Sequence, residues 1–363
     1  MKRVKVAMIG VGAISGIYLK NIRDMFRNIE LVGVCDLVRE RAEKAAAEYG
    51  VPRVYGDMHE AFADSQPEII LNLTRPYEHY DVSMAALKAG KHVYSEKPLA
   101  ATLAEGLSLA AEAEKRGLLL GGAPDTFLGA GIQTCRRLID DGYIGEPLGG
   151  AAFMICRGHE TWHPDPEFYY KHGGGPMLDM GPYYLTALVN LLGRVSEVTG
   201  AAKASFAKRR ITSQPKYGDV IDVDVPTWAN GILQFDSGAI ATIFTTFDVY
   251  YASQARLEIY GSRGTLVAPD PNTFGGPVSL LRPEDGEARE IPLLFGHRDN
   301  SRGVGLSDMA ASMAGGGDFR ASSNQTLHVL EIMSKILESA EAGRRLSMET
   351  PYSRRQPVAE AGL

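Results

Sequence analysis

Apolar residues in the first third of the chain gather in short runs separated by longer stretches of mixed polarity. Runs that are mostly apolar and end at a glycine or a polar residue are typical of buried strands. Five such runs cover residues 4–9, 31–36, 68–73, 92–98 and 118–123. The stretches 39–50 and 79–90 between them are rich in alanine and end at a glycine, which predicts helices. Strands that alternate with helices indicate a doubly wound parallel sheet.

After about residue 124 the pattern changes to β-rich runs at short intervals. Tight turns are predicted at residues 236–238 and 261–264. Few helices separate the runs, so we expect antiparallel pairing between them. The runs cover residues 147–157, 196–206, 226–235, 238–247 and 255–268.

Helices interrupt this second region at two places. One is predicted over residues 178–192 and the other near the C-terminus, over residues 324–343. The glycine-rich residues 296–317 are interpreted as a mobile loop. The change of pattern predicts two domains, residues 1–123 and 124–363.

Composition and charge are those of a soluble globular protein. The chain has 363 residues, of which 45% are hydrophobic and 23% charged, and its formal net charge is −6. This mild charge argues against nucleic acid or an anionic membrane as a partner.

No apolar run approaches the ~20 residues of a membrane span. The N-terminal "MKRVKVAMIG" is too briefly apolar for a signal peptide, so we expect a cytoplasmic location. Cys35, Cys135 and Cys156 show no metal or disulfide spacing, and no metal site is expected.

A glycine motif, "GVGAIS" at residues 10–15, directly follows the first predicted strand and opens a helix. Gly10 permits a tight turn, and Gly12 lets backbone N–H groups approach a pyrophosphate at the helix N-terminus. The third small position falls on Ser15, so the fingerprint is imperfect. Asp36 ends the second strand, where its carboxylate can bind the ribose hydroxyls of NAD and repel a 2′-phosphate. A plain glycine turn with a surface aspartate is the alternative. The nearby Arg41 leaves NADP open.

A second motif, "GKHVYSEKPLA" at residues 90–100, places Glu96 and Lys97 at the end of the fourth strand. The carboxyl edge of such a sheet is where ligands bind. Pro98 fixes the geometry after the lysine and is a candidate for a cis peptide bond. A partly desolvated lysine beside a cationic nicotinamide ring has a lowered pKa and can assist proton transfer. On spacing alone, a surface Lys–Glu pair is the simpler interpretation.

The predicted cofactor contacts are Gly10, Gly12, Ala13, Ile14, Asp36, Arg41, Thr74, Pro76, His79, Glu96 and Lys97.

With these motifs and the later "LIDDGYIGEP" and "GGGPMLDMGPYYL", the chain resembles the Gfo/Idh/MocA oxidoreductases, which include glucose–fructose oxidoreductase and inositol dehydrogenases. The resemblance covers nearly the whole chain. It implies an N-terminal Rossmann domain and a C-terminal α/β domain with a large, mostly antiparallel open sheet. It also implies a tightly held nicotinamide cofactor and oxidation of a sugar-like secondary alcohol. An exposed face of a large open sheet usually needs a partner, so a homodimer or homotetramer is expected.

In this family the lysine of the "EKP" motif, here Lys97, assists acid–base chemistry. The later motif commonly reads Asp-x-Gly-x-His, in which the aspartate orients the substrate and the histidine exchanges the proton. This chain matches at Asp179 and Gly181 but carries Tyr183 at the histidine position, as the glucose–fructose oxidoreductase branch does. A phenol titrates near pH ~10, so Tyr183 needs a neighbouring cation to act as a base. Lys97 and the nicotinamide can supply that charge.

The residues themselves support the same pair. Asp179 and Tyr183 are four positions apart, which places them on one face of a helix. Pro182 is tolerated only in a first turn, so the helix is expected to start near Leu178 or Asp179. The alternative is that Asp179 is a helix N-cap and Tyr183 a core aromatic. Tyr184 is expected to point into the core.

The segment "HETWH", residues 159–163, formally matches the zinc-protease signature. That motif requires a helix, and Pro164 disfavours helical geometry at His163, so we reject zinc. We interpret the segment as a substrate loop in which Trp162 stacks on a sugar ring, with a structural tryptophan as the alternative. The predicted substrate contacts are Lys97, Asp125, Arg157, His159, Trp162, His163, Asp179 and Tyr183.

The sequence therefore predicts an NAD-dependent oxidoreductase that transfers a hydride between the secondary alcohol of a sugar, glycoside or polyol and nicotinamide. A second hypothesis is a redox glycosidase that recycles its NAD. In that reaction a transient 3-keto sugar acidifies the neighbouring C–H, and the glycosidic bond is eliminated. A third hypothesis is a non-catalytic NAD(P)-sensing protein. The simultaneous presence of Lys97, Asp179 and Tyr183 argues against it.

Overall fold

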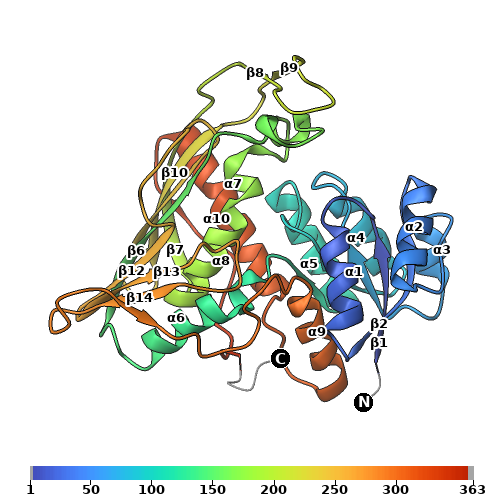
Figure 1. The fold of residues 1–363 in the computed structure, drawn as a ribbon, viewed down its shortest axis with the longest axis horizontal. Coiled ribbons are helices and arrows are strands. Elements are labelled where there is room, and N and C mark those ends of the chain that lie inside the picture. The colour runs from blue at the N-terminus through green and yellow to red at the C-terminus, as the bar shows by residue number, and fades with distance from the viewer. Residues whose placement is uncertain (1–2, 359–363) are drawn as a thin grey trace. The chain divides into compact units, whose positions relative to one another are not determined.

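The computed structural model describes residues 3–358, which fall into two compact units (Figure 1). The first unit contains residues 3–128 and Asn300–Leu327. The second contains Gly129–Asp299 and residues 328–358. The change of sequence pattern predicts a single boundary near residue 123 and does not indicate the return of Asn300–Leu327 to the first unit. Long-range packing causes this return, and a local pattern does not show it.

The first unit is built on a parallel sheet with the strand order β2-β1-β3-β4-β5. All five strands coincide with predicted runs, and the doubly wound α/β expectation is confirmed. The strands are β1 Val4–Ile9, β2 Ile29–Cys35, β3 Ile69–Asn72, β4 His92–Ser95 and β5 Leu120–Gly122. Residues of β3 are buried on both faces because helices cover the sheet on both sides. These helices are α1 Ser15–Asp24, α2 Arg39–Tyr49, α3 Met58–Ala63, α4 His79–Lys88 and α5 Leu103–Arg116.

The predicted mobile loop at residues 296–317 contains a helix, α9, Val304–Gly315. Leu306 and Met309 of this helix are fully buried, and α9 packs against β1 and β5. A Cβ atom on Gly305 would lie 2.2 Å from the hydroxyl of Tyr94. The glycines that suggested mobility therefore permit close packing of helix on sheet.

The second unit is dominated by a nine-stranded sheet with the order β15-β14-β13-β12-β6-β11-β10-β7-β16 (Figure 1). Neighbouring strands are antiparallel except β6 and β11, which are parallel. The expected large, mostly antiparallel sheet is thus confirmed. Its strands are β6 Pro147–Ile155, β7 Val195–Lys203, β10 Trp228–Phe235, β11 Ile240–Thr246, β12 Leu257–Gly261, β13 Gly264–Ala268, β14 Val278–Leu281, β15 Arg289–Ile291 and β16 Leu346–Ser347. A separate pair, β8 Lys208–Arg210 and β9 Val220–Asp222, forms a small two-stranded sheet.

Helices pack against this nine-stranded sheet. The predicted C-terminal helix is confirmed as α10, Ser323–Ala342, and the division between the units falls within it. A further helix, α6 Ala130–Asp140, was not predicted from the sequence and packs on β13 and β14. The helix expected over residues 178–192 is two helices, α7 Gly175–Asp179 and α8 Gly181–Leu192, separated at Met180. No helix in the described part of the chain combines the length and apolar character needed to cross a membrane.

Candidate active site

The glycine turn of the first unit has the shape that a pyrophosphate requires. Gly10 has a φ of +95°, and a Cβ atom there would lie 2.7 Å from the backbone carbonyl group of Leu73. Gly12 is exposed, and a Cβ atom there would meet nothing within 4 Å. The hydroxyl of Ser15 donates to the Gly12 carbonyl oxygen at 2.7 Å where α1 begins. The turn therefore leaves open space in front of a helix N-terminus, which is a cradle for an anion.

Asp36 joins this turn to the end of β2. Its Oδ2 atom accepts a hydrogen bond from the Val11 amide at 2.6 Å, and its Oδ1 atom accepts one from the Val38 amide at 2.8 Å. A carboxylate oxygen has two lone pairs, so each oxygen can still accept a hydrogen bond from a ribose hydroxyl. Of the other predicted cofactor contacts in these segments, Ala13 and Arg41 are exposed and Ile14 is half-buried.

The predicted contacts Thr74, Pro76 and His79 follow β3. Thr74 donates through its hydroxyl to Asn72 at 2.7 Å, and Pro76 is half-buried. His79 is only 1% exposed, and its ring nitrogens lie 2.7 Å from the Pro98 carbonyl oxygen and 3.1 Å from that of Thr74. Burial lowers the pKa of His79 and favours the neutral ring. His79 thus supports the loops after β3 and β4 from inside, and the expectation that it contacts the cofactor is withdrawn.

Glu96 and Lys97 follow β4 as predicted. Glu96 is buried, and its carboxylate accepts hydrogen bonds from the Tyr18 hydroxyl at 2.7 Å and from the Lys97 amide at 3.0 Å. The peptide bond between Lys97 and Pro98 is cis, as the sequence suggested. The Lys97 side chain is half-exposed. Glu96 therefore fixes the backbone from which Lys97 extends and is not itself a surface contact.

Asp125 has a structural role that the sequence did not indicate. It is 1% exposed and accepts hydrogen bonds from the Gly303 amide at 2.8 Å and the Gly305 amide at 3.1 Å. These two donors belong to the start of α9. Burial raises the pKa of Asp125 to about 6. The carboxyl group thus holds α9 in place, which removes Asp125 from the candidate substrate contacts.

In the second unit the structure brings three predicted substrate residues together. The His159 Nε2 atom lies 2.9 Å from the Asp179 Oδ2 atom, and the indole N–H of Trp162 donates to His159 Nδ1 at 3.2 Å. The side chains of His159 and Asp179 are 12% and 14% exposed, whereas Trp162 is 62% exposed. An exposed indole is thus connected through an imidazole to a nearly buried carboxylate.

The remaining residue of the "HETWH" pattern, Glu160, anchors this loop. Residues His159–Thr161 form a single 3₁₀ turn. The Glu160 Oε1 atom accepts hydrogen bonds from the Arg209 guanidinium at 3.0 and 2.6 Å, and both residues are 3% exposed. Arg209 also donates to Asp248 at 2.6 Å. Sequence spacing does not indicate this buried ion cluster, because its members are far apart in the chain.

Asp179 and Tyr183 lie in two different helices, not in one as predicted. Asp179 is the last residue of α7, and Tyr183 lies in the first turn of α8. The two are therefore not successive turns of one helix, and their spacing by itself does not place them on one face. Tyr183 is 7% exposed. Tyr184 is 1% exposed, and burial raises its pKa, which confirms its place in the core.

The other two predicted substrate residues have different partners. The Arg157 guanidinium lies over the ring of Tyr250, 4.5 Å from its centroid. His163 accepts a hydrogen bond from the Asp165 amide at 3.0 Å, and burial lowers the pKa of its imidazole. These contacts give His163 a role in shaping the loop, and they place Arg157 in an aromatic environment.

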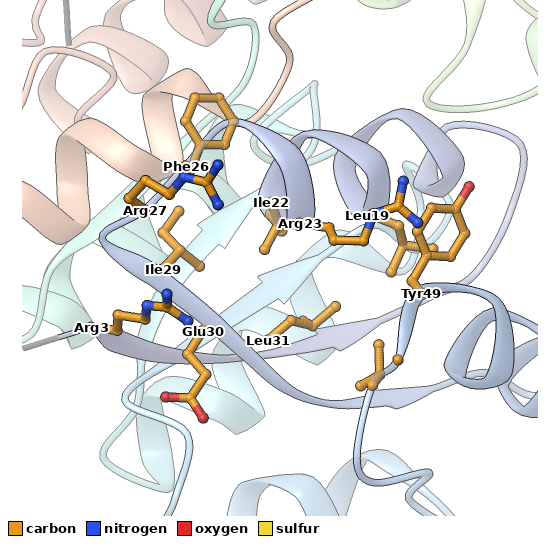
Figure 2. Close-up of a pocket in the computed structure, with 12 residues that line it drawn as sticks. Arg3, Leu19, Ile22, Arg23, Phe26, Arg27, Ile29, Glu30, Leu31 and Tyr49 are labelled. Atoms are coloured by element: carbon orange, nitrogen blue, oxygen red, sulfur yellow. The ribbon is translucent and has the colours of Figure 1, made fainter.

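A surface pocket of about 210 Å³ lies elsewhere in the first unit, over α1 and β2 (Figure 2). Its floor is apolar, with Leu19, Ile22 and Leu31, and charged side chains such as Arg3 and Glu30 lie at its rim. None of the predicted cofactor or substrate residues lines it. The pocket is therefore distinct from the glycine turn.

Comparisons with known proteins match the N-terminal part of the chain and the part that follows it to two separate family models. A family model described as an oxidoreductase family with an NAD-binding Rossmann fold matches residues 4–122. A second model, the GFO/IDH/MocA C-terminal domain, matches residues 132–267. Myo-inositol 2-dehydrogenase of Thermotoga maritima is 26% identical over 73% of this chain and 75% of its own. D-glucoside 3-dehydrogenase of Escherichia coli is 24% identical over 95% of this chain and 97% of its own.

Solved structures show the same fold. An NAD-binding oxidoreductase from Klebsiella pneumoniae has a TM-score of 0.83 at 22% identity and covers 95% of this chain and 99% of its own. Levoglucosan dehydrogenase in complex with NADH and levoglucosan has a TM-score of 0.81 at 19% identity, covering 96% and 100%. The two family models together match most of the chain, including the glycine turn in one and Asp179 in the other. The chain therefore belongs to the GFO/IDH/MocA family of oxidoreductases and is an enzyme with an NAD-binding Rossmann domain.

Proposed function

We propose that this enzyme oxidises a secondary alcohol of a sugar, glycoside or polyol with NAD, using Lys97, Asp179 and Tyr183. The observation that carries the substrate class is the cluster of Trp162, His159 and Asp179 in the second unit. An exposed indole can stack on the apolar face of a sugar ring, and a carboxylate accepts hydrogen bonds from hydroxyl groups. Relatives that act on inositols and glucosides support the same class.

The residues of the first unit are suited to NAD. The backbone N–H groups of the turn at Gly12 and the N-terminus of α1 would hold the pyrophosphate, and Asp36 would bind the ribose hydroxyls. A 2′-phosphate would be repelled by the Asp36 carboxylate, so we expect a preference for NAD over NADP. When bound, NAD supplies the acceptor for the hydride.

The chain's own residues would handle the proton. Oxidation of a carbinol releases a hydride from carbon and a proton from oxygen. We assign the proton to Tyr183, with the positive charge of Lys97 favouring its phenolate form. Asp179 would accept a hydrogen bond from a substrate hydroxyl and orient the ring.

Absorbance of NADH at neutral pH, measured with a panel of substrates, tests the proposed function. The panel contains myo-inositol, scyllo-inositol, methyl β-D-glucoside and D-apiose, each with NAD and with NADP. We expect turnover with at least one compound and a loss of about 10²-fold or more in Lys97→Ala and Tyr183→Phe. NAD binding without turnover on any panel member would contradict the proposal, and full activity of Tyr183→Phe would contradict the assignment of the proton.

A cofactor-recycling glycosidase is a second candidate. It is favoured by the similarity to D-glucoside 3-dehydrogenase along nearly the whole of both chains. Oxidation at C3 of a glucoside acidifies the C–H at C2, and elimination, addition of water and reduction would release free sugar. Release of p-nitrophenol from a nitrophenyl glucoside without net NADH formation would distinguish this reaction from simple oxidation.

We also propose that the enzyme is a homodimer or homotetramer that associates through its large sheet. Apolar side chains are exposed along one face of four strands, namely Ile232, Ile240, Tyr260 and Leu281. The strand registers place them on the same face. Ile240 is opposite Gly149 and Gln234, and Gln234 lies two positions from Ile232 on β10. Tyr260 is opposite Gly149 and Thr265, and Thr265 is opposite Leu281. Several exposed apolar side chains on one sheet face are typical of an interface between subunits.

A further inference from the structure

We infer that His159 is a positioning residue for Asp179 and that Trp162 connects it to the substrate. This inference rests on the proposed function, because it assigns Asp179 to substrate orientation. Sequence spacing did not indicate the arrangement, since His159 and Asp179 are 20 positions apart.

The hydrogen bonds define the tautomer of His159. An indole nitrogen can only donate, so the bond from Trp162 makes Nδ1 of His159 the acceptor. The proton of the neutral imidazole then resides on Nε2 and is donated to Asp179 Oδ2 at 2.9 Å. The three side chains form a chain of hydrogen bonds that runs in one direction, from the indole through the imidazole to the carboxylate.

Packing holds the imidazole in this position. The ring centroids of Tyr169 and Phe247 lie 4.2 and 4.7 Å from that of His159. The carboxylate of the next residue, Glu160, is buried against the Arg209 guanidinium. A Cβ atom on Gly158 would lie 2.1 Å from the Glu160 carboxylate and 2.2 Å from the Tyr170 hydroxyl. The backbone that carries His159 is therefore packed tightly against the ion cluster.

Asp179 stands at the end of a short helix. This residue ends a five-residue helix and precedes the break at Met180. Its carboxylate needs a hydrogen-bond donor to hold one orientation, and the His159 N–H group is such a donor. Displacement of a substrate-orienting group by about 1 Å can lower a rate about 10²-fold. Loss of the His159 N–H should therefore lower kcat, whereas loss of the exposed Trp162 ring should mainly raise KM.

Two substitutions of His159 separate positioning from proton transfer. Glutamine has an amide N–H that can donate to Asp179 and a carbonyl oxygen that can accept from Trp162, but it does not titrate. Phenylalanine keeps the aromatic packing and removes both hydrogen bonds. We expect His159→Gln to stay within about 5-fold of the wild-type kcat, and His159→Phe to lose about 10²-fold.

The pH profile provides a readout that a purely structural role would not move. The titratable groups that face His159 are Asp179, His163 and Tyr169. We expect His159→Gln to keep the wild-type dependence of kcat on pH. If His159→Gln is as inactive as His159→Phe and loses the acidic limb of the profile, His159 itself carries the proton and the positioning role is refuted. Wild-type activity of His159→Phe would also overturn it.

A measurement without substrate separates this inference from the proposed function. In ¹⁵N-labelled holoenzyme, the His159 ring should show a protonated Nε2 and an unprotonated Nδ1, and Asp179→Asn should shift the Nε2 resonance. Failure of every compound in the substrate panel would refute the proposed function while this signature persisted. The opposite tautomer at His159 would refute the inference even in an active enzyme. Circular dichroism of each variant checks that it is folded.

Discussion

At the scale of single residues, burial determines what a polar side chain does. The sequence predicts substrate contacts at both Asp125, which follows the fifth predicted strand, and Asp179, which belongs to the family motif. Asp125 lies 1% exposed beneath two amides of α9, whereas the side chain of Asp179 keeps 14% of its surface and a histidine partner. A carboxylate with two backbone donors in a buried position stabilises structure. Asp179, which is linked through His159 to an exposed indole, keeps its proposed role as a substrate contact.

The first prediction concerns Asp125 and pH. Its pKa is raised from 3.8 to about 6, so between these pH values the folded protein binds more protons than the unfolded chain. The free energy of unfolding therefore contains a contribution that falls as the pH rises from about 4 to about 6. The difference amounts to roughly 3 kcal/mol. Asp125→Asn keeps an acceptor oxygen without a charge, so we expect it to be more stable than wild type at pH 7 and less dependent on pH.

Urea unfolding at pH values from 4 to 7 checks this prediction. The matched control is Asp81→Asn, the same change at an exposed position of the first unit. Stability curves of wild type and Asp125→Asn that run parallel through the whole range would show that Asp125 does not titrate there.

The second prediction concerns Arg209. The guanidinium bonds both Glu160 and Asp248, and all three side chains are at most 4% exposed. Arg209→Met would leave two buried carboxylates without their cation, which costs about 3–5 kcal/mol. The neighbouring Arg210 is exposed, so Arg210→Met should be almost neutral. Thermal unfolding of both variants checks the contrast, and equal stability of the two would contradict the role of the buried ion cluster.

At the scale of elements, close approach distinguishes glycines that flex from glycines that pack. In α9, Gly305 lies against Tyr94 and donates its amide to Asp125. Gly315, at the other end of the same helix, has nothing within 4 Å of a Cβ position. The sequence alone does not distinguish these two glycines, but packing requires a glycine only at Gly305.

The third prediction follows from this contrast. Gly305→Ala should destabilise the protein by roughly 1–3 kcal/mol, because the added methyl group would overlap the Tyr94 hydroxyl at 2.2 Å. Gly315→Ala should be neutral or stabilising by up to about 1 kcal/mol, because alanine restricts the unfolded chain more than glycine does. Urea unfolding gives both values. A Gly305→Ala protein as stable as Gly315→Ala would show that α9 tolerates a larger separation from β4.

At the scale of the whole molecule, the nine-stranded sheet presents a face that helices do not cover. Ile232 and Ile240 on that face are 49% and 52% exposed. Burying such side chains contributes about 25 cal/mol per Å² of apolar surface, so we expect two copies to associate through this face.

The fourth prediction tests this face. We expect light scattering after size-exclusion chromatography to give a dimer or tetramer for the wild type and a smaller species for Ile240→Lys. Leu107 is 46% exposed on α5 of the first unit and is not part of the nine-stranded sheet. Leu107→Lys should keep the wild-type mass. A monomeric wild type would exclude association through the sheet.

The sequence by itself determined the parallel sheet of the first unit, the turn at Gly10 and Gly12, and the segment from Glu96 to Pro98. These features depend on residues close together in the chain: short apolar runs, a positive φ, and a strand end. The family resemblance added the second sheet, which the structure and the comparisons confirm.

Only the tertiary structure decided which polar residues meet. His159 pairs with Asp179 across 20 positions, Glu160 with Arg209 across 49, and Asp125 with Gly303 across 178. Such pairs form because distant elements pack together, and no periodicity along the chain records which of them will do so. The same packing turned a glycine-rich stretch into α9 and divided the helix around Met180. The sequence thus identified the kind of enzyme, and the fold determined how its candidate site is held.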